Sequence, residues 1–186
     1  MTTVRTRTLP LMLVMGAMAI LACGTGLAPL SPTPPGGAVK VSGAAADELE
    51  KNVRNQIFNP AKRDFRISIT NQQATSYANL RNTSLPLEKP QIWFTQGKAF
   101  IRGTFTAICL FHPDVLIIAA PRVKDKQIIV NVQQIYAGTF GLPQDWLETV
   151  SKGVTDSITD ARINVDFERV EVLEGELVIA GSKRAQ

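Results

Sequence analysis

Apolar and polar side chains alternate through much of residues 65–182, which is the spacing of β-strands that bury one face. Phe65, Ile67 and Ile69 open this series, with a polar residue between each pair. Short polar or glycine-containing pairs interrupt it and are typical of hairpin turns. The predicted strands are 65–70, 91–96, 99–111, 114–124, 127–137, 162–173 and 176–182.

Three two-residue turns fix the pairing of neighbouring strands, and the side-chain pattern tests each register. The turns are Gly97-Lys98, Asp125-Lys126 and Glu174-Gly175. Each register gathers apolar residues on one face of its hairpin. The predicted pairs are Phe94 with Ile101, Ile92 with Gly103, Val123 with Ile128, Pro121 with Val130, Ala119 with Val132, Val172 with Leu177, and Val170 with Ile179.

Three other segments show the spacing of helices. Residues 44–58 carry an apolar side chain at every fourth position, and Asn59-Pro60 ends them. Thr70 can cap a short helix over residues 71–80, and Pro143 suits the start of a longer one over 143–160. The apolar positions are Leu49, Val53 and Ile57 in the first helix, Ala74, Tyr77, Ala78 and Leu80 in the second, and Trp146, Val150, Val154 and Ile158 in the third.

Hairpin-connected strands dominate this order, so the sequence predicts an α+β fold. We expect about seven strands in one mostly antiparallel sheet, packed against the long amphipathic helix 143–160. The length of the chain after residue 43 fits a single globular domain over residues 44–186.

The N-terminus resembles a bacterial lipoprotein signal. Arg5 and Arg7 precede an apolar run over residues 9–22, and small Ala22 comes directly before Cys23. In signals of this kind the cysteine thiol receives a diacylglycerol, and cleavage leaves it as the acylated N-terminus. We therefore expect a signal peptide over residues 1–22 and a lipid anchor at Cys23, on the extracytoplasmic face of the bacterial cell membrane. An ordinary secretory signal, or an uncleaved anchor with an incidental cysteine, is the alternative.

Residues 24–43 are rich in proline and glycine and have no periodic apolar pattern, so we expect a tether between the anchor and the domain. The net charge of +4 at pH 7 falls by two when Arg5 and Arg7 are removed. No dense basic cluster with interleaved aromatic residues is present, which argues against nucleic-acid binding. A weak attraction to anionic lipid headgroups stays open.

Catalytic and metal-binding chemistry has little support in the sequence. His112 is the only histidine and is interpreted as a turn residue, while Cys109 in an apolar run is interpreted as a buried hydrophobe. With Cys23 acylated, no intrachain disulfide or cysteine–histidine zinc site can form. Asp156 and Asp160 fall on the polar side of helix 143–160. We therefore expect no catalytic residues, no metal, no cofactor and no enzymatic activity.

The strands over 99–111 and 114–124 are apolar on both faces at 105–111 and 115–120, so something covers both sides. An ordinary core is one interpretation. A groove between the sheet and helix 143–160 that accepts an acyl chain is the other. The groove would be lined by Phe105, Ala107, Ile117, Ala119, Val130, Val132, Trp146, Val150 and Val154.

A family resemblance covers about residues 65–181. It rests on the strand-to-helix step at 67–73, the hairpins around Gly97 and Asp125, the segment 136–143, and the closing segment 170–181. This order resembles the LmeA-like and YpmS-like families of bacterial envelope proteins, which look like small tubular lipid-binding (TULIP-type) domains. The resemblance implies a curved sheet around a long helix with a hydrophobic interior. It carries no ligand-contact residue over to this chain.

Two classes of function follow. The first is a membrane-anchored module, without enzymatic activity, that binds a lipid or another hydrophobic ligand in the groove. The alternative is a scaffold that contacts an envelope protein through an exposed patch of Trp93, Phe100 and Arg102, since tryptophan and arginine are typical interface anchors. A hydrolase that uses His112 as its base is a third, weaker hypothesis.

Overall fold

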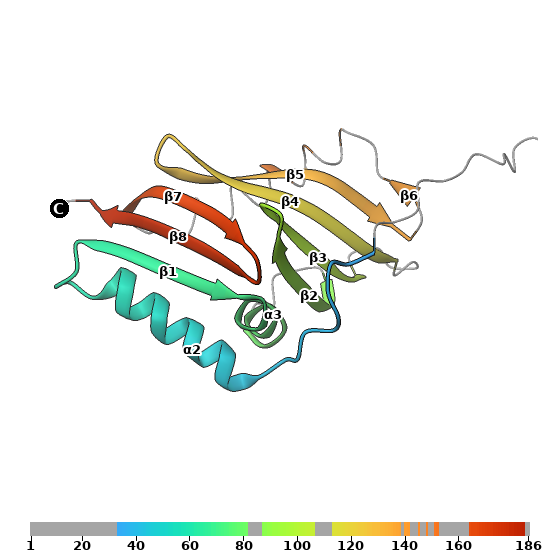
Figure 1. Ribbon diagram of the computed structural model, residues 1–186, viewed down its shortest axis with the longest axis horizontal. Coiled ribbons are helices and arrows are strands. Elements are labelled where there is room, and N and C mark those ends of the chain that lie inside the picture. The colour runs from blue at the N-terminus through green and yellow to red at the C-terminus, as the bar shows by residue number, and fades with distance from the viewer. Residues whose placement is uncertain are drawn as a thin grey trace, which may run out of the picture. The chain divides into compact units, whose positions relative to one another are not determined.

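The computed structural model describes residues 33–81, 87–106, 113–138, 140–141, 145, 148, 151–152 and 164–184 of the 186-residue chain. Their strands form two antiparallel sheets, with the orders β1-β8-β7 and β2-β3-β4-β5-β6 (Figure 1). The α+β prediction is confirmed, whereas the prediction of one continuous sheet is wrong. The strands are β1 (Asp64–Thr70), β2 (Leu87–Thr95), β3 (Lys98–Phe105), β4 (Asp114–Lys124), β5 (Gln127–Ala137), β6 (Phe140–Gly141), β7 (Val165–Leu173) and β8 (Glu176–Lys183).

Helix α2 (Gly43–Val53) continues into the π-helical turn η1 (Arg54–Phe58). Together they confirm the predicted helix over 44–58. The side chain of Ser42 caps its N-terminus by accepting a hydrogen bond from the backbone N–H of Ala45. Ile57, at the end of the apolar stripe, packs against the first sheet in a core of buried side chains. This core consists of Ile57, Phe65, Ile67 and Val165, with Val53, Ile69, Phe167 and Ile179 around it.

In the first sheet, β8 is the central strand, between β1 and β7. The turn at Glu174-Gly175 has the predicted register, with Val172 opposite Leu177. Gly175 has a φ of +81°, which glycine adopts without strain. The confirmed register also sets Gly181 between Phe65 and Phe167 on the two outer strands.

In the second sheet, the β4–β5 hairpin has the predicted register, including Val123 opposite Ile128 and Ala119 opposite Val132. The β2–β3 hairpin differs, because its turn residues are Gln96 and Gly97, both with positive φ. Such a turn matches the twist of the paired strands. The shift moves the partner of each residue by two positions. The predicted pairs are therefore wrong, but each side chain still lies on the predicted face of the sheet. The observed pairs are Phe94 with Ala99 and Ile92 with Ile101.

Strand β2 also begins earlier than the predicted strand 91–96 and includes Pro90. The pairing shifts between Glu88 and Gln91, and Lys89 has a φ of +47° there. A proline lacks the N–H that a central strand needs, but it fits an edge strand at such an irregularity. Pro90 is fully buried at this edge.

Helix α3 (Asn71–Leu80) lies against that edge of β2 and supplies the hydrogen bonds that a neighbouring strand would supply. Asn71 accepts from the N–H of Phe94 at 2.8 Å. Thr75 accepts from the N–H of Ile92 at 2.9 Å and donates to its carbonyl at 3.3 Å. The amide of Asn79 donates to the carbonyl of Pro90 at 2.7 Å. Because α3 covers this edge, none of the described strands pairs with β2 there, and the two sheets stay separate.

The predicted helix over 71–80 is confirmed, and Thr70 caps it in a reciprocal pair with Gln73. Its predicted apolar face is wrong in part, because Tyr77 and Leu80 are exposed. The side of α3 that faces the protein is mostly polar, as its contact with a strand edge demands. Its buried residues are Gln73, Thr75, Ser76 and Ala78.

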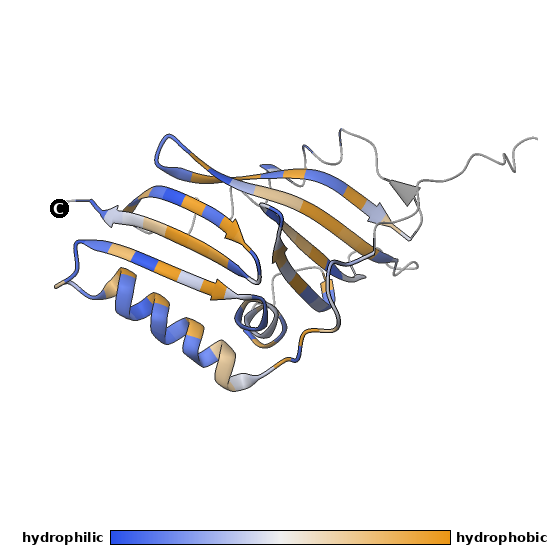
Figure 2. Cartoon of the chain, viewed as in Figure 1, coloured by the Kyte–Doolittle hydropathy of each residue, from blue (hydrophilic) through white to orange (hydrophobic). Residues whose placement is uncertain are grey.

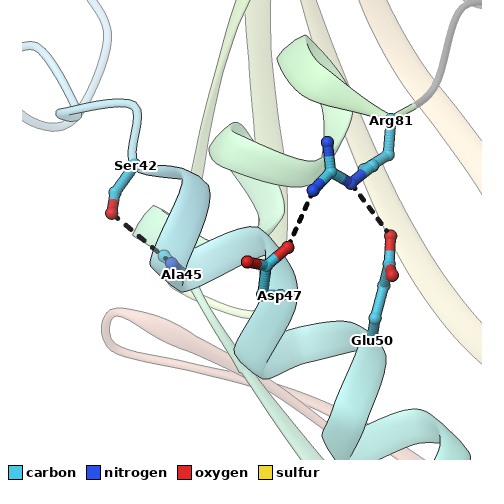
Figure 3. A network of polar contacts seen from close by, with 5 residues as sticks. All are labelled: Ser42, Ala45, Asp47, Glu50 and Arg81. Atoms are coloured by element: carbon cyan, nitrogen blue, oxygen red, sulfur yellow. Dashed lines mark hydrogen bonds and ion pairs between the residues drawn. The ribbon is translucent and has the colours of Figure 1, made fainter.

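One arginine links the two helices (Figure 3). Arg81, directly after α3, donates to Asp47 at 2.7 Å and to Glu50 at 3.2 Å on α2. These partners, Asp47 first, raise the pKa of Arg81 above its ordinary value. All three side chains are substantially exposed, so we assign this network only a small contribution to stability.

Two backbone hydrogen bonds join the sheets at single points. The N–H of Phe167 donates to the carbonyl of Lys126 at 3.0 Å, and that of Gly175 donates to Phe94 at 2.8 Å. Asp166 supports the first junction, because it accepts from Lys126 at 2.7 Å and from Arg184 at 2.6 Å. These bonds, that of Lys126 first, hold the pKa of Asp166 below its ordinary value.

A carboxylate with a lowered pKa stabilises the folded state fully above its unfolded pKa, and this contribution disappears as the pH falls through the folded value. We expect Asp166→Asn to be less stable than the wild type by a constant margin between about pH 5 and pH 7. Below about pH 4 the margin should shrink. Urea unfolding at a series of pH values tests this, and a margin that persists unchanged in acid would contradict it.

Candidate functional site

One face of the second sheet gathers a cluster of aliphatic side chains from β4 and β5. Ala119, Val132 and Ile135 are buried at its centre, and Ile117 and Val130 are half-buried around them. The register explains the grouping, because Ala119 pairs with Val132 and Ile117 with Ile135. Val132 and Ile135 lie three positions apart in β5, which in a regular strand would put them on opposite faces. The pairing irregularity between Ile118 and Ala119 keeps both side chains on the same face. Figure 2 shows apolar residues along most of β4.

Five of the nine predicted groove residues lie in the described part of the chain. Four of them, Ile117, Ala119, Val130 and Val132, belong to this cluster. Phe105 is half-buried at the end of β3, where it pairs with Leu87. Ala107, Trp146, Val150 and Val154 lie outside the described residues, as does most of the predicted helix 143–160.

The four described residues of that predicted helix are helical. Ser151 is half-buried, and its hydroxyl accepts a hydrogen bond from the backbone N–H of Val132 at 2.9 Å. The helix therefore touches β5 at a residue whose side chain belongs to the aliphatic cluster. Glu148 and Lys152 of the same predicted helix are exposed.

The opposite face of the second sheet carries Trp93, and here the predicted exposed patch is corrected. Trp93 is only 6% exposed, and Gly36 lies so close to its indole ring that a Cβ atom there would come within 3.0 Å of Cδ1. Its Nε1–H donates to the carbonyl of Gly37 at 3.0 Å. The predicted exposed patch is therefore wrong as stated: Trp93 is covered, Phe100 is half-buried, and Arg102 alone is exposed.

The tether prediction for residues 24–43 also fails over its C-terminal part. The N–H of Val39 donates to the side chain of Gln91 at 2.6 Å, and the N–H of Ser42 donates to the hydroxyl of Ser76 at 3.0 Å. Residues 36–42, called the strap below, thus belong to the folded domain (Figure 1, blue). Sequence reasoning missed it because its contacts use backbone groups, which leave no apolar period. The adjacent glycines were the available signal, since they permit close approach.

A cleft of about 450 Å³ lies beside the strap, and one of about 350 Å³ adjoins it. Both are bordered by Thr33 and Pro34, and by the ion pair of Arg102 and Asp114 at 3.4 Å. Thr104 donates to Asp114 at 3.1 Å and fixes that carboxylate. The ion pair is more than half exposed, so it stabilises the fold little and is open to solvent.

The described residues offer no arrangement for metal binding, because no three His, Cys, Asp or Glu side chains gather among them. Cys23, Cys109 and His112 lie outside the described part of the chain. In the same part, no helix has the length and apolar character needed to span a membrane.

Comparison with known proteins adds no relative to this description. No protein-family model matches the sequence, and neither the curated proteins nor the solved structures contain a significant match.

Proposed function

We propose that this protein is a bacterial lipoprotein, anchored through Cys23 at the extracytoplasmic face of the membrane, that binds a lipid or another hydrophobic ligand without catalysing a reaction. The aliphatic cluster on the second sheet carries the proposal. Ala119 is small, and the half-buried Ile117 and Val130 border it. In the proposal, an acyl chain lies along this face beneath residues 143–160.

Desolvation would drive such binding. Each methylene that leaves water for an apolar surface gains about 0.8 kcal/mol, so even part of an acyl chain suffices. The hydrogen bond from the backbone N–H of Val132 to Ser151 supports a helix at the edge of β5, directly beside this cluster. In the sequence, Leu147 and Val154 stand four positions before and three after Ser151, which is the helical spacing for one side.

Two neighbouring residues of β5 provide a matched test. Val130 is half-buried on the face of the aliphatic cluster, and Ile129 is half-buried on the opposite face, where it pairs with Arg122. We expect Val130→Asn to lower lipid retention about tenfold, because an amide without partners in an apolar groove is costly. Ile129→Asn should leave retention unchanged.

Native mass spectrometry of the full-length protein, released from membranes in mild detergent, measures the bound lipid. A wild-type protein that neither carries lipid nor takes it up from added vesicles would overturn the proposed ligand. Equal retention in the two variants would place the ligand elsewhere.

The anchor has its own test. Cys23→Ala removes the thiol that would receive the diacylglycerol, so the protein should stay unprocessed in the membrane or enter the soluble fraction. The wild type should partition into detergent, and its N-terminal peptide should begin at Cys23 and carry a lipid mass. An unmodified N-terminal peptide, or one that begins upstream of Cys23, would refute the lipoprotein assignment.

A scaffold without a lipid ligand is the second candidate. Such a scaffold would have to use a surface other than the predicted patch, because Trp93 lies under the strap and only Arg102 of that patch is exposed. A filled interior beside the aliphatic cluster, with no lipid in the native mass spectrum, would favour the scaffold.

A further inference from the structure

A large aromatic side chain is exposed at the end of the first helical segment. Phe58, the last residue of η1, is 64% exposed, whereas its neighbour Ile57 is buried in the core against the first sheet. The two side chains therefore point in different directions from the same π-helical turn. Such turns are rare and occur frequently at functional sites.

The turn that follows Phe58 is tied to the end of β8. The side chain of Asn59 accepts from the N–H of Ala61 at 3.0 Å, and its carbonyl accepts from Nζ of Lys183. The N–H of Lys183 donates to the carbonyl of Arg63 at 2.9 Å. Phe58 is thus presented on a fixed turn, at the end of the domain where β8 ends (Figure 1).

The surroundings of Phe58 in the chain are basic. Residues 51–63 contain four basic residues and no acidic one, and with Asp64 directly after them the segment stays net positive. Each of the four is exposed, and within the described part of the chain none forms an ion pair. The four are Lys51, Arg54, Lys62 and Arg63.

Arg54 precedes Phe58 by four residues, so the two lie on the same side of the helical segment. Leu173 provides the contrast. It is 42% exposed at the end of β7, but it pairs with Glu176 and directly precedes Glu174. An exposed apolar side chain thus occurs at both places, and only Phe58 is combined with unpaired positive charge.

This combination is complementary to the surface of an anionic phospholipid bilayer. Basic side chains are attracted to the negative headgroups, and an apolar ring beside them enters the boundary between the headgroups and the acyl chains. A second copy of this chain fits less well, because a twofold interface around Phe58 would bring the same basic residues together.

We propose that Phe58 and the four basic residues form a docking surface for anionic membranes, at which the ring inserts among the lipid headgroups. This surface is distinct from the proposed ligand site, because Phe58 lies beside the first sheet and the aliphatic cluster lies on the second. It does not depend on Cys23 either. A lipid anchor raises the effective concentration of bilayer but does not select the face that meets it.

Tryptophan fluorescence of the full-length protein tests the insertion. Phe58→Trp is mixed with vesicles whose phospholipids carry bromine in their acyl chains, which quenches tryptophan only at close range. The parent protein, measured in parallel, gives the signal of Trp93 and Trp146. With equal parts of phosphatidylglycerol and phosphatidylcholine, the signal of the introduced tryptophan should fall about twofold or more. With phosphatidylcholine alone it should not change.

Charge reversal tests the basic residues. Lys62→Glu with Arg63→Glu, added to Phe58→Trp, should abolish the quenching. Lys40→Glu with Lys89→Glu is the matched control, because it changes the net charge equally at two exposed lysines of the strap and β2. This control should keep the quenching. All of these side chains are exposed, and circular dichroism verifies that each variant is folded.

Leu173→Trp, in place of Phe58→Trp, reports on the acidic end of β7 and should not be quenched. The proposal is overturned if both tryptophans are quenched equally, if phosphatidylcholine vesicles quench as strongly as anionic ones, or if the two charge variants behave alike. Binding to anionic vesicles without quenching would overturn insertion of the ring. A response to a single-stranded oligonucleotide, with none to vesicles, would identify nucleic acid as the occupant instead.

Discussion

Gly181→Ala is expected to lower the free energy of unfolding by about 4 kcal/mol or more, enough to prevent folding at ordinary temperature. A Cβ atom at this position would lie 2.2 Å from the carbonyl oxygen of Asp166 and 2.9 Å from Cζ of Phe65. Phe65 and Phe167 meet edge to face over the glycine, with ring centroids 6.0 Å apart. The first sheet cannot admit the methyl group without moving backbone.

Gly43→Ala is the control for this substitution, because Gly43 is the first residue of α2 and a Cβ atom there meets nothing within 4 Å. Urea unfolding followed by circular dichroism measures both variants. A Gly181→Ala protein as stable as Gly43→Ala would show that the close packing of β8 between β1 and β7 is wrong.

Thr75→Val should cost about 3 kcal/mol of unfolding free energy, although the two side chains have nearly the same volume. Thr75 is completely buried, and its hydroxyl serves both the N–H and the carbonyl of Ile92. Valine leaves these two backbone groups without that partner, and each unpaired buried group costs about 1–3 kcal/mol. The same unfolding measurement applies.

Thr75→Ser separates the hydroxyl from the methyl group. It keeps both hydrogen bonds and loses one methyl group, so we expect a cost of about 1 kcal/mol. If serine proved as harmful as valine, packing of the methyl group, and not coverage of the β2 edge, would explain the role of Thr75.

The sequence was most informative where the fold depends on local geometry. The turns at Asp125-Lys126 and Glu174-Gly175 fix their hairpins, and both registers are confirmed to the residue. At the first hairpin, Gln96 enters the turn with a φ of +52°, a conformation that side-chain pattern does not reveal. A slip of this kind moves partners by two and preserves the faces.

Contacts between distant segments were predicted less well. Helix α3 buries polar side chains because it covers a strand edge, whereas amphipathic reasoning assumes that the buried side of a helix is apolar. The strap shows the same limit, since backbone hydrogen bonds and two glycines carry no hydrophobic period. Both features depend on β2, which lies far from the strap in sequence.

The candidate site was predicted in part for a similar reason. Alternation along β4 and β5 identified Ile117, Ala119, Val130 and Val132 as one group, and the structure brings them together with Ile135. Ile135 was missed because the irregularity in β5 reverses the alternation between Val132 and Ile135.

Photo-crosslinking with a phospholipid that carries a diazirine in its acyl chain tests the central claim most directly. Full-length protein and vesicles that contain this lipid are irradiated together, and mass spectrometry locates the attached lipid. Lipid binding at the aliphatic cluster predicts attachment at Ile117, Val130 and their neighbours on the same face of β4 and β5. Attachment confined to the N-terminal segment or to the opposite face, at Phe100 and Ile129, would contradict it.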